Sequence, residues 1–134
     1  MTASRERPVV AIDEIPIVAA LAARARGVTQ VYDVKELRVK ESDRIRAIVG
    51  LLRNFGVQIE EHEDGFSVEG RSDTPLSGGR VQSHGDHRIA MTAAVLGLVA
   101  DGPTVVEDVA CIATSFPRFA GTLRALGAEV EVES

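Results

Sequence analysis

The sequence predicts an α/β fold in which helices and strands alternate, and three observations support that prediction. An apolar run over residues 15–26 ends at Gly27 and leads into a segment rich in β-branched residues, 28–34. The same order returns about 75 residues further on, over residues 89–109. Apolar residues make up 45% of the 134 positions and aromatic residues only 4%, which suits one domain with an aliphatic core.

The first copy of this repeat is bounded by capping and turn residues. Asp13 is expected to open the first helix as its N-cap, because Pro16 fits a first helical turn. Ser42 is the expected cap of the second helix, and Gly56 its C-terminal stop. An acidic turn at Glu63 joins two strands of alternating polarity. The expected elements are a strand at residues 9–12, helices at 15–26 and 45–55, strands at 28–34, 57–60 and 65–70, and a surface loop at 71–79.

The second copy follows the same order but stops early. Asp86 is the expected N-cap of a helix over residues 89–100. Ser115 is the expected cap of a helix over residues 116–126, with Pro117 in its first turn. Strands are expected at residues 104–109 and 129–132. Because the second copy lacks a closing hairpin, the chain is expected to be one α/β domain or a fragment of one.

Composition limits the classes of function. The net charge of -5 argues against nucleic acid or an anionic membrane as a partner. The single cysteine, Cys111, excludes an internal disulfide framework and a multi-cysteine zinc site. His62 and His84 have no metal-ligand spacing, so no metal site is expected. The sequence contains no apolar run of about 18 residues, and we therefore expect a cytoplasmic protein without a membrane span.

Two arginines lie where a cation is electrostatically unfavourable. Arg44 and Arg88 each follow an expected N-cap by two residues, where the helix dipole costs a cation about 0.3–1 kcal/mol unless a negative charge offsets it. One interpretation is a carboxylate or phosphate held by both guanidinium groups, which would then lie exposed on one face. The other is a capping salt bridge to a flanking carboxylate: Asp43 or Glu41 for Arg44, and Asp86 for Arg88.

Four further residues have both a structural and a functional interpretation. Lys40 and Glu41 belong either to a solvated charge run or to a loop that projects over a ligand, with Lys40 as a further anion partner. Glu41 suits acid catalysis only where burial favours its protonated form. Asp13 is a helix cap by default, and a general base if a substrate hydroxyl binds beside it. His87 is by default a helix-start residue bonded to the backbone.

Four motifs together resemble a known family nearly from end to end. Residues 13–16, 38–44, 86–91 and 114–117, in this order, closely resemble the C-terminal part of the 5-enolpyruvylshikimate-3-phosphate synthases. The resemblance implies the β-α-β-α-β-β repeat units of the enolpyruvyl transferase fold, with helices packed against mixed sheets. The chain then forms a partial domain of about two units, roughly residues 9–82 and 83–134.

The same resemblance implies an activity and its partners. Enzymes of this family transfer the enolpyruvyl group of phosphoenolpyruvate to the 5-hydroxyl of shikimate 3-phosphate and release phosphate, in chorismate and aromatic amino-acid biosynthesis. No cofactor is implied. The missing N-terminal part of the enzyme supplies most contacts to shikimate 3-phosphate, so the isolated chain is expected to be inactive.

The resemblance also assigns roles to individual residues. Asp13 matches the aspartate that contacts the shikimate hydroxyl and accepts its proton, and Glu41 matches the glutamate proposed to move a proton at the methylene carbon. Arg44 and Arg88 match the arginines that hold phosphoenolpyruvate. The substrate-binding residues carried over are Lys40, Arg44, Asp86, His87 and Arg88.

Two departures and two rival functions accompany the resemblance. Thr114 and Glu36 stand where one branch of the family has a lysine and an asparagine. The related transferase that acts on UDP-N-acetylglucosamine uses a cysteine in a mobile glycine-rich loop, and Cys111 lies in no such loop. A noncatalytic phosphoanion-binding α/β module is the alternative from a different functional class.

Overall fold

The chain enters its first helix through a short 3-10 turn. The computed structural model describes residues 12–132, so the expected strand at residues 9–12 lies outside the described residues except for Ile12, which begins the turn η1 (Ile12–Glu14). Helix α1 (Ile15–Arg24) follows directly, with Glu14 at the N-cap position. Asp13 therefore does not cap α1, contrary to the prediction, and its carboxylate makes other contacts described below.

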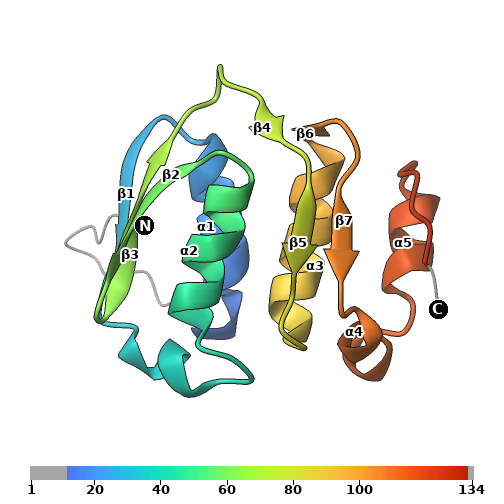
Figure 1. Cartoon of the computed structure of the whole chain (residues 1–134), viewed down its shortest axis with the longest axis horizontal. Helices are drawn as coiled ribbons and strands as arrows, with labels where there is room; N and C mark the ends of the chain where they lie inside the picture. The colour runs from blue at the N-terminus through green and yellow to red at the C-terminus, as the bar shows by residue number, and fades with distance from the viewer. Residues whose placement is uncertain (1–11, 133–134) are drawn as a thin grey trace.

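The predicted hairpin is present and lies within a three-stranded sheet. Strands β2 (Gln58–His62) and β3 (Gly65–Gly70) pair antiparallel. Strand β1 (Gly27–Val31) pairs antiparallel with the other edge of β3, which gives the order β1-β3-β2. Helices α1 and α2 (Arg44–Asn54) cover one face of this sheet (Figure 1), and Phe66 is fully buried beneath them. The α-β-α-β-β order of the first copy is thus confirmed over the described residues.

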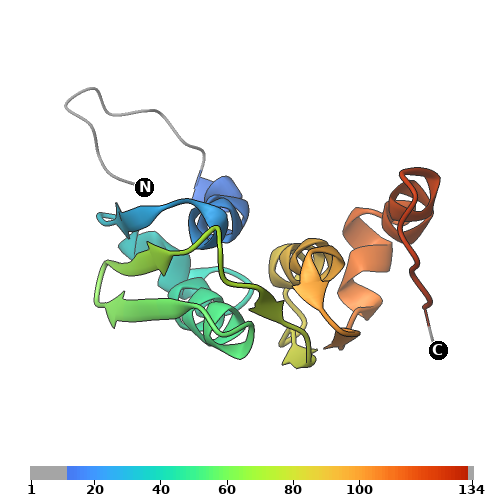
Figure 2. The ribbon, with the colours of Figure 1, turned by 90° about the horizontal axis from the view of Figure 1, so that it is seen from above.

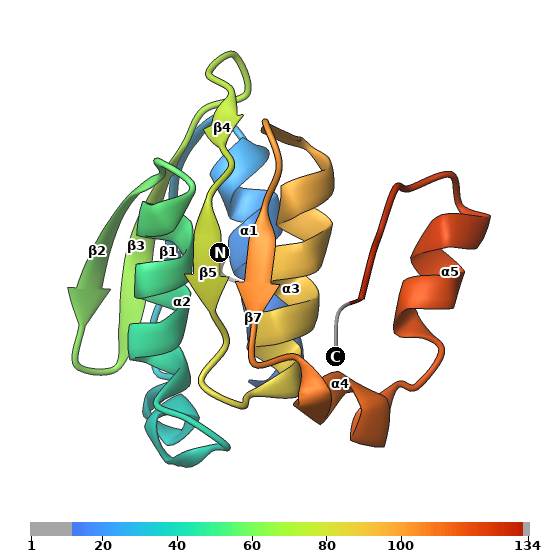
Figure 3. The ribbon, with the colours of Figure 1, turned by 45° about the vertical axis from the view of Figure 1, so that its right-hand side comes forward.

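The second half pairs short strands that lie far apart in the sequence. Strand β4 (Leu76–Ser77) pairs in parallel with β6 (Ala100–Asp101), and β5 (Arg80–Gln82) pairs in parallel with β7 (Val105–Glu107). Helix α3 (His87–Leu98) connects them, and Figure 3 shows β5 and β7 lying side by side next to it. Packing of α3 against both α1 and α2 joins the two halves.

The predicted start of the last helix is wrong. Ser115 does not cap it but ends a separate short helix, α4 (Ala110–Ser115), and the following helix is α5 (Phe119–Ala125). Phe116 between them is extended, with φ -148° and ψ 75°. A residue that precedes proline is disfavoured in the helical region, so Pro117 separates the two helices instead of opening one.

The predicted strand at residues 129–132 is also wrong, because this segment has no regular secondary structure. A strand needs a hydrogen-bonded neighbour, and the segment follows α5 at the far end of the molecule from the three-stranded sheet (Figure 2). The predicted strand at 104–109 is confirmed as β7, whereas the expected loop at 71–79 contains β4.

No helix among residues 12–132 is long and apolar enough to cross a membrane.

One aliphatic core extends through the packed helices and the sheet. The side chains with no exposed surface include Ala19, Leu37, Ile45, Ile48, Leu52, Phe66, Val68, Ile89 and Ala93. All of these residues except Leu37 come from α1, α2, α3 and β3, so their burial fixes how the three helices lie on one another, and with them the site at their N-terminal ends.

Two glycine substitutions test the close packing of α1 against β3. A Cβ atom at Gly70 would lie 2.0 Å from the Ala25 carbonyl oxygen and 2.1 Å from that of Ala22, so Gly70→Ala forces the backbones apart. We expect it to lower the free energy of unfolding by about 1–3 kcal/mol, measured by urea denaturation. Gly50→Ala is the control, because no atom lies within 4 Å of that Cβ in α2, and we expect it to stabilise by about 0.5–1 kcal/mol. Equal effects of the two changes would contradict this packing.

Candidate functional site

Three helices begin at the same end of the molecule. The N-terminal ends of α1, α2 and α3 all lie toward the lower end of the view in Figure 1, as does the 3-10 helix η2 (Lys35–Val39) that precedes α2. Each helix N-terminus contributes a partial positive charge and free N–H groups. This end of the molecule therefore favours carboxylates and bound anions, and the predicted site residues from three separate segments meet here.

Arg44 is enclosed by three carboxylates. Its Nε lies 2.8 Å from Asp86 Oδ2 and its Nη2 lies 3.1 Å from Asp86 Oδ1. Nη1 donates to Asp13 Oδ1 at 3.0 Å, and Nη2 also donates to Glu41. The side chain is only 1% exposed, so the expectation of an exposed Arg44 is wrong. The capping salt bridge with Glu41 exists, but it is one of three ion pairs that neutralise this guanidinium.

Asp86 is the buried partner that holds Arg44 in place. Its carboxylate is fully buried and accepts hydrogen bonds from Arg44, from Ser42 Oγ at 2.8 Å and from the Arg88 amide at 3.0 Å. Burial by itself would raise the pKa of Asp86, but the hydrogen bonds and charge of Arg44 and the hydrogen bond of Ser42 outweigh it and hold that pKa below its usual value. Asp86 has no exposed surface and acts on the site by positioning Arg44, and its predicted direct contact with substrate stays a prediction.

The other two carboxylates around Arg44 remain open to solvent. The side chain of Asp13 is 46% exposed and that of Glu41 is 51% exposed. Lys40 lies on the same side, with its Nζ 3.6 Å from Asp13 Oδ1. Arg44 thus has an inner edge fixed by a buried carboxylate and an outer edge held by exposed ones. The outer contacts are the ones that an incoming anion can replace.

Arg88 differs from Arg44 in having no ion pair within the described part of the chain. Its backbone N–H bonds to the Asp86 cap, as predicted, but its guanidinium has no ion pair or side-chain hydrogen bond with any residue between 12 and 132. Arg88 lines a groove between α1 and α3, and Asp13 stands at the same groove. The remaining groove residues are mainly apolar: Ile17, Met91, Val95 and Phe119.

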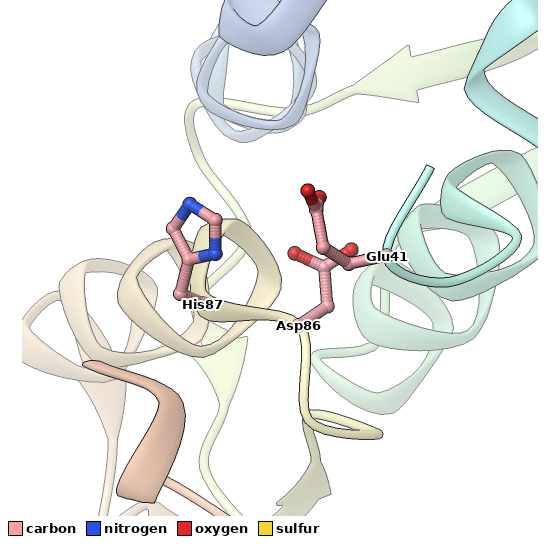
Figure 4. Close-up of side chains that lie close together, drawn as sticks. All are labelled: Glu41, Asp86 and His87. Atoms are coloured by element: carbon pink, nitrogen blue, oxygen red, sulfur yellow. The ribbon is translucent and has the colours of Figure 1, made fainter. Parts of the chain in front are cut away.

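His87 lies beside two of the carboxylates. Figure 4 shows its ring next to Glu41 and Asp86, and one ligand atom from each of the three residues lies within 4.8 Å of the others. Such a trio can hold a metal ion. Here both carboxylates are already bound by Arg44, and both Asp86 oxygens accept two hydrogen bonds each. A metal ion would have to displace Arg44, so we propose no metal centre.

The cap of α2 is Asp43 and not the predicted Ser42. Asp43 Oδ1 accepts from the Arg46 amide at 3.2 Å, which places Arg44 at the first helical position. Serine and aspartate both cap helices well, so the sequence alone does not show whether Ser42 or Asp43 is the cap. Ser42 instead bonds Asp86, a contact over 44 residues that no local pattern signals.

Comparisons with known proteins assign the chain to a family. The family model described as EPSP synthase (3-phosphoshikimate 1-carboxyvinyltransferase) matches residues 9–133. The chain belongs to the EPSP synthase family. It is 54% identical over 117 residues to the 3-phosphoshikimate 1-carboxyvinyltransferase of Parvibaculum lavamentivorans, and 52% identical over 108 residues to that of Aquifex aeolicus.

The family match covers most of this chain but a minor part of its relatives. The matched segments span 87% and 81% of the chain, yet 26% and 25% of these two relatives. An EPSP synthase structure from Acinetobacter baumannii superposes with a TM-score of 0.88 at 39% identity, over 92% of this chain and 29% of that one. The α/β fold of a partial enolpyruvyl transferase domain is thereby confirmed.

The Arg44–Asp86 pair generates a prediction about stability and pH. Asp86→Asn leaves the buried Arg44 charge uncompensated, and we expect it to lower the free energy of unfolding by about 3 kcal/mol at pH 7. The lowered pKa of Asp86 means that its ionised form stabilises the fold at neutral pH, and that this contribution is lost as the pH falls below about 4.

Urea denaturation of both proteins between pH 7 and pH 3 measures this difference. Asp101→Asn, at an exposed position in β6, is the matched control and should change stability little at any pH. A difference between Asp86→Asn and the unmodified chain that stayed constant down to pH 3 would contradict the assignment.

Proposed function

We propose that this chain carries the phosphoenolpyruvate side of the active site of a 3-phosphoshikimate 1-carboxyvinyltransferase. In this reaction the 5-hydroxyl of shikimate 3-phosphate adds to the enolpyruvyl group, and inorganic phosphate leaves. The observation that carries the proposal is the meeting of Arg44, Lys40 and Arg88 with two half-exposed carboxylates at three helix N-termini, in a chain of the EPSP synthase family.

The cations suit a ligand with a carboxylate and a phosphate. Arg88 has a guanidinium without a partner among the described residues and can bind either group in a two-pronged manner. Lys40 supplies a point charge beside Asp13, and Arg44 supplies a planar fork whose orientation Asp86 fixes. Fixed positive groups of this kind stabilise the charge that develops on the departing phosphate.

Two carboxylates suit the proton transfers. Addition of the hydroxyl oxygen to C2 of the enolpyruvyl group requires a base at the hydroxyl and a proton donor at the methylene carbon, C3. Asp13 is assigned as the base and Glu41 as the donor. When phosphate leaves C2, C3 gives back one proton and the double bond re-forms. Both side chains are half exposed and lie on either side of the outer edge of Arg44, so both can face one ligand.

Binding then involves an exchange of partners at Arg44. The carboxylate of phosphoenolpyruvate takes the place of Glu41 at Nη2, while the buried contact with Asp86 is retained. The exchange releases the Glu41 carboxyl group from Arg44, so that it can turn toward the methylene carbon. Substrate binding and the availability of the proton donor are coupled in this way through one guanidinium.

A noncatalytic phosphoanion-binding module is the second candidate. It is favoured by the cations at the helix N-termini, which can bind an anion without any turnover. A transferase must orient two substrates and exclude water, which needs groups from both sides of a cleft. We therefore expect the chain alone to release no phosphate from the two substrates.

A chimera tests the proposal directly. In it, this chain replaces the matching quarter of the Parvibaculum lavamentivorans relative, and phosphate release is measured with both substrates present. We expect turnover on the scale of about 10 per second from the chimera and none from the isolated chain. A folded chimera that binds phosphoenolpyruvate without turnover would support the noncatalytic alternative instead.

Three substitutions in the active chimera separate the roles of the site residues. Asp13→Asn and Glu41→Gln keep the side-chain shape but remove the proton-transfer group, so each should lower kcat by roughly 100-fold or more. Arg88→Lys keeps the charge but loses the planar fork, and should mainly raise KM for phosphoenolpyruvate. Asp101→Asn, exposed in β6 and not a groove residue, is the control and should leave both constants unchanged. An unchanged kcat in Asp13→Asn and Glu41→Gln would refute the acid–base assignment.

A further inference from the structure

Arg38 makes an extensive set of polar contacts next to the site, and within residues 12–132 none of them reaches helix α3 or the groove. Its Nη1 donates to both Asp43 oxygens, at 3.2 and 3.0 Å, and to Glu61 Oε2 at 2.9 Å. Its Nη2 donates to the His62 carbonyl at 2.7 Å, and its Nε to the Glu63 carbonyl at 3.0 Å. One side chain thus connects η2, the start of α2 and the β2–β3 turn.

These contacts close the loop that carries Lys40 and Glu41. Arg38 precedes the loop and Asp43 follows it, so their ion pair holds the two ends of residues 39–42 together. Asp43 also caps α2, and Glu61 ties the same guanidinium to the sheet. The ends of the loop are therefore fixed to two rigid elements, helix α2 and the three-stranded sheet.

Among the described residues, the loop of residues 39–42 makes few contacts on its solvent side other than those of Arg38. None of residues 39–42 is buried, and Val39 is 83% exposed. Within residues 12–132, no backbone hydrogen bond joins residues 40–42 to a neighbouring element. On the inner side the contacts are Lys40 to Asp13, Glu41 to Arg44 and Ser42 to Asp86. Under the proposed function, substrate replaces the Glu41 contact, which leaves the loop more dependent on its outer anchor.

We propose that Arg38 is a positioning residue that holds the Lys40–Glu41 loop in register with the active site while the inner contacts of that loop are exchanged for substrate. The proposal rests on the proposed function for its kinetic consequence, but its structural part stands by itself. Arg38 meets no groove residue, so it acts through the loop and not on the substrate.

The chain offers a matched control on the same 3-10 helix. Lys35 also pairs with the hairpin turn, at 3.0 Å from Glu63, but the two side chains are 69% and 81% exposed and lie before the loop. Exposed pairs of this kind contribute little. Lys35→Met and Arg38→Met therefore remove one cation each from the same element and differ in whether the loop loses its anchor.

The first measurement is amide hydrogen exchange of the 134-residue chain. We expect Arg38→Met to raise exchange at residues 39–43 at least tenfold and to leave strand β3 within twofold, while Lys35→Met changes neither region. Arg38→Lys should resemble Arg38→Met, because an ammonium group cannot make the five hydrogen bonds of the fork. If Arg38→Met unfolds the chain, Asp43→Ser serves instead, since serine keeps the helix cap but removes the ion pair. Unchanged loop exchange, or an equal rise in Lys35→Met, would overturn the proposal.

The second measurement is kinetic, in the chimera. We expect Arg38→Met to lower kcat about 10- to 100-fold, the effect of a small displacement of catalytic groups, whereas Lys35→Met should leave kcat unchanged. A loop that loosens without any loss of kcat in an active chimera would contradict the positioning role. An inactive chimera with the unmodified chain would count against the proposed function, and the exchange result would then decide the role of Arg38 alone.

Discussion

The arrangement of the site depends on the buried ion pair between Arg44 and Asp86. It joins the N-terminus of α2 to that of α3, across 42 residues and between the two copies of the repeat. Because neither group reaches solvent, each charge is stabilised by the other and by the hydrogen bonds around them, and removal of either leaves an uncompensated charge in the core. Ser42 adds a bond to the same carboxylate from the neighbouring loop. The pair thereby sets how the loop with Lys40 and Glu41 lies relative to the helix with Arg88.

Electrostatics explains why carboxylates gather around this pair. Three helix N-termini and three basic side chains place excess positive charge at one end of the molecule. Asp13, Glu41 and Asp86 balance it within the protein, so no foreign anion is needed for a stable fold. The three carboxylates are not equivalent, however. Asp86 is buried and hydrogen-bonded on both oxygens, whereas Asp13 and Glu41 are about half exposed and already partly hydrated. Displacement of the exposed carboxylates costs less desolvation and leaves the core pair intact.

The parts of the fold that the sequence predicted are those set by local signals. The hairpin of β2 and β3 and the helices α1, α2 and α3 follow from periodicity, turn residues and glycine stops, which act within a few residues. The incorrect predictions concern features that depend on residues distant in the sequence. The burial of Arg44 depends on Asp86, and residues 129–132 form no strand because no strand lies beside them. Motif resemblance predicted the site residues as a group, but could not distinguish the buried Asp86 from the exposed Glu41, since burial is a property of the assembled helices.

The two arginines also show how one sequence placement yields two physical roles. Arg44 and Arg88 each lie in the first turn of a helix capped by an aspartate, Asp43 for α2 and Asp86 for α3. Asp86 serves both helices: it caps α3 through the Arg88 amide and pairs with the Arg44 side chain from α2. That second bond orients Arg44 before any ligand arrives, which removes the cost of ordering it during binding. Arg88 has no such partner among the described residues and faces the groove. A site built from one fixed guanidinium and one adaptable guanidinium can hold an anion in a defined orientation and still follow it as its charge moves from one group to another.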